Sequence, residues 1–184
     1  MKLLRLAPAA ALAACAFSAH ADPLPPAGVV ALEAFFDGCL DPVGARKDPA
    51  PALEHAIGGY RHDAATAPDA QHPEHKLWRV RGVDGDVELE TFTGKAWCEV
   101  RLIGADPDEA ARKLNGALSR LDVPMQRKSE AGDAPGVTSE TVVLGHDGGD
   151  VVELTVRKSR EPKDGEPGLT LRAVPIRVGG GQGQ

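Results

Sequence analysis

The sequence is poor in aromatic residues, in positive charge and in long apolar runs. Its 184 residues include two Trp, one Tyr and four Phe, and 21 Lys and Arg face 27 Asp and Glu. The resulting net charge of -6 argues against a protein that binds nucleic acid by neutralising phosphates. A chain of this length can bury the core of one domain, but not two domains around a cofactor cleft. We therefore expect one domain, no cofactor and no nucleic-acid partner.

Short motifs that would mark an enzyme are also missing. Gly-x-Ser-x-Gly, the P-loop, the Rossmann glycines and His-Glu-x-x-His are all absent from the sequence. Glu88 and Glu90 are a pair of carboxylates, but they alternate with Val87 and Leu89 as the solvent-facing residues of a strand do. These absences favour a protein that is not an enzyme, and we predict no catalytic residue.

Residues 1–21 have the pattern of a secretory signal peptide. Lys2 and Arg5 precede an apolar stretch of about 14 residues, and Ala19-His20-Ala21 supplies a small-x-small cleavage pattern. Cleavage near Ala21 predicts a periplasmic or secreted protein. A second interpretation is a lipobox, because Leu12-Ala13-Ala14-Cys15 has that form and a lipidated Cys15 would anchor the protein to a membrane. We predict no transmembrane segment, since no other stretch is long and apolar enough.

Cysteine is scarce, and signal cleavage makes its count even. Removal of residues 1–21 takes away two positive charges, so 19 basic residues face 27 acidic ones and the net charge becomes -8. It also removes Cys15 and leaves Cys39 and Cys98 in an oxidising compartment, where a disulfide is the default expectation. A redox-active pair is the alternative, but such pairs are usually close in sequence, as in Cys-x-x-Cys. We therefore expect a structural disulfide.

Hydrophobic periodicity predicts an α+β fold. Helices are expected over 29–40, 52–60 and 106–121, the last with Asp106 as its N-cap and Pro107 at its first position. Strands are expected over 76–81, 86–93, 95–103, 123–129, 137–144, 151–158 and 169–178. Helical spacing places Cys39 on a buried stripe, and alternation turns Cys98 inward and Glu99 outward.

These elements predict an antiparallel sheet of about six to seven strands, packed with one long and one or two shorter helices and tied by one disulfide. Residues 22–28 form an extended leader in this interpretation. A single domain occupies 29–178, and 179–184 form a disordered Gly/Gln tail.

Histidines are concentrated in the segment 55–75, and the part between His62 and His75 is expected to be an exposed loop. His62, His72 and His75 lie among carboxylates and are candidate zinc or copper ligands. However, Pro73 separates the last two, and no recognised metal-site spacing is complete. The glycine- and aspartate-rich segment 145–150 lacks the closing Glu of a calcium loop, so a hairpin loop is the expectation there.

Aromatic residues supply a candidate partner-binding surface. Trp78, Phe92 and Trp97 fall on neighbouring strands. If they are exposed on one sheet face they mark a contact surface, and if a helix covers them they belong to the core.

Two stretches carry a resemblance to small exported proteobacterial proteins of unknown function. They are Phe35-Phe36-Asp37-Gly38-Cys39-Leu40 and Gly94-Lys95-Ala96-Trp97-Cys98-Glu99-Val100, with Trp78 between them. The resemblance covers about residues 29–121 and implies export and a disulfide-tied α+β fold. Periplasmic immunity proteins against cell-wall-degrading toxins are similar in size and charge.

Three functional hypotheses follow from the sequence. The first is a non-catalytic periplasmic module that binds another envelope or secreted protein, as an inhibitor or immunity protein does. The second is a metal-binding protein or metal-dependent enzyme that uses the segment His55 to His75. The third is a structural envelope lipoprotein anchored through Cys15.

Overall fold

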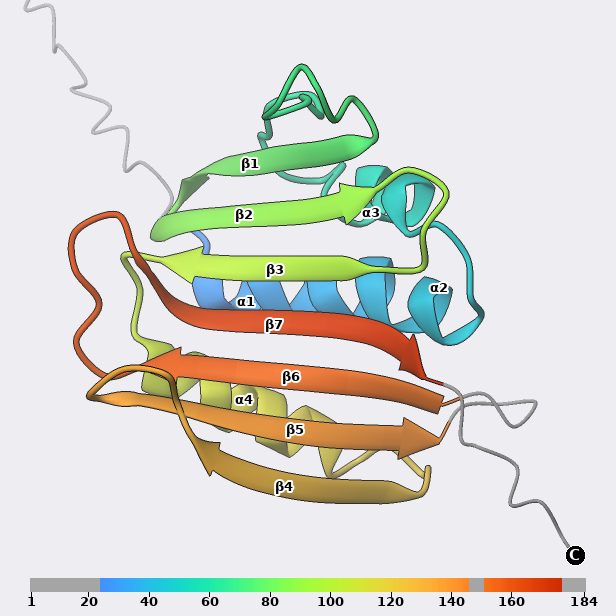
Figure 1. The fold of residues 1–184 in the computed structure, drawn as a ribbon. Coiled ribbons are helices and arrows are strands. Elements are labelled where there is room, and N and C mark those ends of the chain that lie inside the picture. Colours follow the sequence, from blue (N-terminus) through green and yellow to red (C-terminus); the bar gives the residue numbers. More distant parts are fainter. Residues whose placement is uncertain (1–23, 146–150, 177–184) are drawn as a thin grey trace, which may run out of the picture.

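The structure is a computed structural model that describes residues 24–145 and 151–176 (Figure 1). The predicted signal peptide with Cys15, the cleavage position near Ala21 and the predicted Gly/Gln tail lie outside the described residues. The same holds for residues 146–150 of the predicted hairpin loop.

Seven antiparallel strands form one sheet, in the order β1-β2-β3-β7-β6-β5-β4. The strands are β1 (His75–Val83), β2 (Gly85–Phe92), β3 (Cys98–Ile103), β4 (Met125–Ala131), β5 (Val137–Gly145), β6 (Val151–Ser159) and β7 (Pro167–Ile176). The sheet is built from two meanders, β1-β2-β3 and β4-β5-β6-β7, which join where β3 pairs with β7. The α+β class and the antiparallel sheet predicted from the sequence are confirmed.

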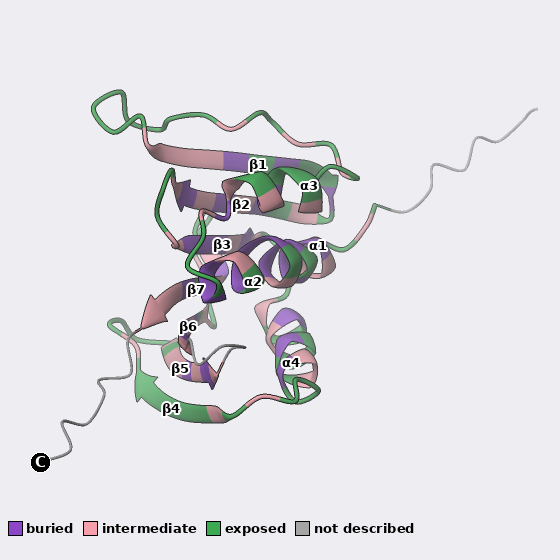
Figure 2. Ribbon diagram, turned by 90° about the vertical axis from the view of Figure 1, so that its right-hand side faces the viewer, coloured by how far each residue is buried: buried purple, intermediate pink, exposed green. Residues whose placement is uncertain are grey.

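The helices all pack on one face of this sheet (Figure 2). A helical run from Ala27 to Gly44 crosses β2, β3 and β7, and α4 (Pro107–Leu118) covers β6 and β7. Apolar residues alternate along the strands toward these helices and are buried with the inner side of each helix. The core contains large, fully buried side chains from both layers, including Phe35, Leu53, Trp78, Leu89, Leu114 and Leu171.

The first helical run consists of α1 (Ala27–Glu33), a π-helical segment η1 (Ala34–Leu40) and α2 (Asp41–Gly44). The sequence predicted that this helix ends at Leu40, because Asp41-Pro42 follows, and that prediction was wrong. Leu40 and Asp41 keep helical backbone angles, and the ring of proline fixes φ at a value that a helix also adopts, so the run continues through Pro42 to Gly44.

The predicted Cys39–Cys98 disulfide is confirmed, and it ties η1 to the first residue of β3. Both cysteines are fully buried among apolar side chains. A buried bridge between two core elements is inaccessible to thiols in solution, which agrees with a structural role.

The remaining helices differ from their predicted bounds by a few residues. The helix α3 (Ala50–Ala56) follows a turn in which the Asp48 carboxylate accepts hydrogen bonds from the N–H groups of Ala50 (2.9 Å) and Gly94 (2.7 Å). For α4, Asp106 caps the N-terminus as predicted, accepting from the N–H groups of Asp108 and Glu109. Within the described residues, no helix has the length and apolarity needed to cross a membrane.

Candidate functional site

The face of the sheet opposite the helices is not covered by any described element, and we call it the open face (Figures 1 and 2). Alternation along β2, β3 and β7 places charged side chains there, at Glu88, Glu90, Glu99, Arg101 and Arg172. The cross-strand register sets Glu90 directly opposite Glu99, and Glu99 opposite Arg172. Two carboxylates facing one another repel unless a cation lies between them.

Arg101 supplies that cation. Its guanidinium contacts the Glu90 carboxylate at 2.6 Å and the Glu99 carboxylate at 2.8 Å. Although desolvation lowers the pKa of Arg101, the charges and hydrogen bonds of Glu90 and Glu99 outweigh it and raise the pKa above the usual value. The planar fork of arginine suits this bridging role, because it donates to two acceptors at once.

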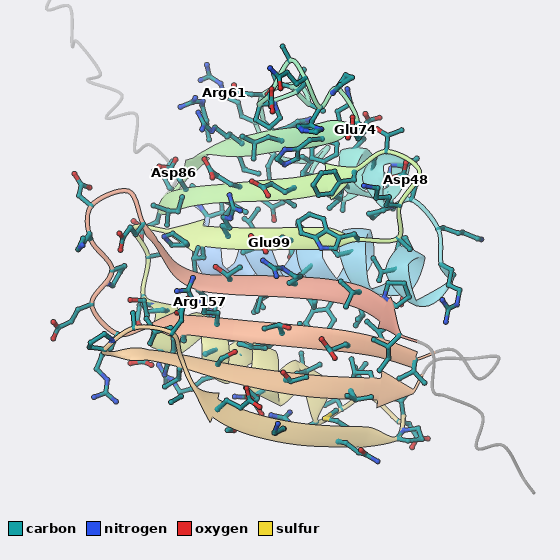
Figure 3. All side chains as sticks on the ribbon, in the orientation of Figure 1. Asp48, Arg61, Glu74, Asp86, Glu99 and Arg157 are labelled. Atoms are coloured by element: carbon teal, nitrogen blue, oxygen red, sulfur yellow. A yellow bond between two sulfur atoms is a disulfide. The ribbon has the colours of Figure 1, made fainter. Side chains whose placement is uncertain are left out.

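Glu99 is the centre of the network and is labelled in the middle of the sheet in Figure 3. Its side chain is only 3% exposed, and its second carboxylate oxygen accepts from Arg172 at 2.6 Å. At the β1 side, Arg79 pairs with Glu88 at 2.8 Å. The charged residues of four adjacent strands are therefore held by one another rather than by water alone.

An aromatic cluster closes one end of this network. His75 stacks on Phe92 with ring centroids 4.7 Å apart, and Phe92 meets Trp97 edge to face at 5.0 Å. The His75 ring also lies 3.5 Å from the Glu90 carboxylate, and Arg172 stands 5.8 Å from the centroid of the Trp97 ring. Aromatic rings flanked by charged groups are typical of protein contact surfaces.

Of the three aromatic residues considered as a candidate partner-binding surface, one lies in the core and two lie on the open face. Trp78 is 1% exposed and lies beneath the helices, so it belongs to the core. Phe92 and Trp97 are partly exposed on the open face. Strand β3 begins at Cys98 rather than at residue 95 as predicted, because the turn after β2, with Gly94 at φ 75°, extends to Trp97.

The three candidate metal ligands do not form one ligand set. His62 approaches the carbonyl of Tyr60 (3.1 Å), His72 lies beside Glu74 (3.3 Å) and Asp69, and His75 belongs to the aromatic cluster. In residues 24–145 and 151–176, no three or more His, Cys, Asp or Glu side chains are grouped as metal ligands.

A polar cleft of about 530 Å³ adjoins the open face where the β4–β5 turn approaches the β6–β7 loop. Arg157, labelled in Figure 3, lines this cleft and pairs with Asp133 at 2.6 Å. The cleft also contains Glu161, Lys163 and Glu166, so charges of both signs line it.

Sequence reasoning missed the ion-pair network, although it placed Glu99 and Arg101 on the outward side of their strand. Alternating charges along three successive strands were a usable signal. What the sequence did not provide was the pairing of β3 with β7, which brings Arg172 to Glu99 across 73 positions.

Comparisons with known proteins give no relative. No protein-family model matches the chain, no curated protein matches it, and no solved structure matches it.

Proposed function

We propose that the protein is an exported, non-catalytic binding module that holds another envelope or secreted protein against its open face. The observation that carries this proposal is a sheet face with no described covering layer, on which charged side chains are fixed in place and an aromatic pair lies at one end. Side chains that are already ordered lose little conformational entropy when a partner binds. Tryptophan, as at Trp97, is among the residue types that most often anchor such contacts, and phenylalanine, as at Phe92, is enriched in interfaces.

The arrangement of the carboxylates supports binding rather than catalysis. Oxygens of Glu88, Glu90 and Glu99 are each within 2.8 Å of an arginine guanidinium. A general acid or base must instead reach a substrate atom directly. The buried disulfide supports export, because such bridges persist in oxidising compartments. In this proposal residues 1–21 are removed near Ala21, and lipidation at Cys15 remains the alternative route to the same compartment.

The sharper form of the proposal is an inhibitor or immunity protein for a basic exported toxin or hydrolase. With residues 1–21 removed, the net charge of -8 steers a positively charged partner toward the molecule. The open face then supplies the contact surface.

Site-specific photocrosslinking tests which face binds. A benzoylphenylalanine placed at Thr170, in the middle of the open face, should give one reproducible crosslinked protein in the cell envelope. The same group at the exposed Glu54 of α3, on the helix side, is the control and should give none. Crosslinks that form from Glu54 and not from Thr170 would overturn the assignment of the face.

Truncation of Trp97 is a second test of the proposed binding surface. Trp97→Ala should reduce the crosslink from position 170 by about tenfold or more if Trp97 acts as an anchoring residue. Leu121→Ala removes an exposed apolar side chain away from the open face and should leave the yield unchanged. Equal yields from the two variants would contradict the role of Trp97.

A further inference from the structure

The two edge strands of the sheet, β1 and β4, differ in whether described residues bond to their outer sides. Along β1, residues 61–66 run beside the outer edge and bond to it. The N–H of Asp63 donates to Arg79 (2.9 Å), Thr66 and Leu77 exchange two hydrogen bonds (3.0 and 2.8 Å), and the N–H of Arg81 donates to Arg61 (2.8 Å). Strand β4 forms the other border of the sheet in both views, and no described residue pairs with its outer side (Figures 1 and 2).

The backbone groups that β4 presents outward can be identified from its pairing with β5. The N–H of Gly145 donates to Pro124 (2.9 Å) and the N–H of Gly132 donates to Val137 (3.1 Å), so the even-numbered residues of β4 face β5. Because antiparallel pairing alternates, the odd-numbered residues turn their N–H and C=O groups to the outside. These residues are Met125, Arg127, Ser129 and Ala131. Such a row of free groups is a template for another strand.

The charged side chains of β4 determine which strand can pair with its outer edge. Lys128 and Glu130 lie two positions apart on the open face, with side chains 76% and 54% exposed. If β4 meets β4 of a second copy about a two-fold axis at Ser129, Lys128 of each copy lies directly opposite Glu130 of the other. Opposite charges across an antiparallel pair are stabilising, and like charges are destabilising.

Neighbouring registers are penalised by the same rule. An axis at Lys128 places two lysines opposite each other, an axis at Glu130 places two glutamates, and an axis at Arg127 places two arginines. Charged residues on an edge strand normally discourage pairing. On β4 they discourage every register near the middle of the strand except one.

We propose that β4 is a self-complementary edge by which two copies of this chain associate, antiparallel and centred on Ser129. The pairs Ser129–Ser129, Arg127–Ala131 and Ala131–Arg127 contribute about six backbone hydrogen bonds in this register. The two seven-stranded sheets join into one, and the axis is perpendicular to it. Both open faces then lie on the same side, so the dimer presents the binding surface twice.

Sedimentation velocity tests the dimer over protein concentrations from about 10 µM to about 1 mM, a range suited to a small interface. The purified protein should convert from monomer to dimer as concentration rises. Ser129→Pro removes one outward N–H and none of the bonds to β5, so it should abolish the dimer while the circular dichroism spectrum is retained.

Exchanging the charges of Lys128 and Glu130 is a more specific test of the proposed register. Lys128→Glu places like charges opposite each other twice and should weaken the dimer by about tenfold or more. The double variant Lys128→Glu, Glu130→Lys restores complementarity and should recover the dimer. Lys113→Glu, on the outer face of α4, is the charge-matched control and should leave association unchanged.

Two results would overturn the proposal. One is a protein that stays monomeric throughout the concentration range. The other is a dimer that Ser129→Pro and Lys128→Glu leave intact, since that dimer would use a different surface. Neither result bears on whether the open face binds a partner.

Discussion

Replacing Glu99 by glutamine should destabilise the protein, because it leaves two guanidinium groups facing a neutral amide. The Glu99 side chain is 3% exposed, and its oxygens lie 2.8 Å from Arg101 and 2.6 Å from Arg172. Removing one partner of a buried ion pair costs about 3–5 kcal/mol. The loss is smaller here, because Arg101 keeps Glu90 and the Arg172 side chain is 50% exposed, so we expect about 2–3 kcal/mol. For a chain of this size that lowers the melting temperature by roughly 4–12 °C.

Urea unfolding, followed by circular dichroism and tryptophan fluorescence, measures this loss. Glu140→Gln is the matched control, because that carboxylate is 26% exposed and pairs with one arginine, Arg127, at 3.2 Å. An ion pair at this exposure contributes about 0–1 kcal/mol. If Glu99→Gln costs no more free energy of unfolding than Glu140→Gln, the idea that Glu99 is the buried centre of the network is refuted.

Three further predictions concern the helical layer. With both cysteines of the disulfide replaced by serine, loop entropy over 59 positions gives a loss of about 4 kcal/mol in urea unfolding, and a loss below about 1 kcal/mol would contradict it. In Gly38→Ala the new Cβ would lie 2.5 Å from a methyl carbon of Leu53, so we expect a cost of about 1–3 kcal/mol. Gly59→Ala meets no atom within 4 Å and should stay within about 0.5 kcal/mol in the same assay. The hydrogen bond from the Tyr60 hydroxyl to the Glu33 carboxylate (2.6 Å) raises the pKa of Tyr60. Glu33→Gln should therefore lower the midpoint of an ultraviolet absorbance titration, which reports on the single tyrosine of the chain, and an unchanged midpoint would rule out this cause.

Local pattern was enough to predict which side chains turn inward. Helical spacing placed Cys39 on a buried stripe, and alternation placed Cys98 inward with Glu99 on the opposite side of the strand, and the structure agrees. A disulfide between two inward-facing cysteines followed from these two local rules and the redox compartment. Both rules act over a few residues, so they do not depend on the order of the strands.

The candidate site depended on information that local pattern does not contain. Arg172 reaches Glu99 because the last strand inserts between β3 and β6, and nothing in the spacing of charges specifies that insertion. Likewise, alternation placed Trp97 on the side of its strand opposite Cys98, but whether Trp78 is core depended on which side of β1 the helices cover.

The open face and its ion pairs have a common physical reason. An antiparallel sheet can leave one face in water if that face is polar, whereas an apolar face of this extent would promote aggregation. Isolated charges would satisfy that condition, but they would be mobile. A network of ion pairs keeps the open face polar and also fixes its side chains in place. Arg101 connects this network, because it contacts both Glu90 and Glu99.

Arg101→Lys tests that bridge, because lysine keeps the charge but lacks the planar fork that spans two carboxylates. Glu90 and Glu99 then face each other with one of them poorly compensated. The variant should lose about 1–2 kcal/mol of unfolding free energy near neutral pH. Urea unfolding measures this loss, and a variant as stable as the wild type would mean that one ammonium group compensates both carboxylates as well as the guanidinium of Arg101 does.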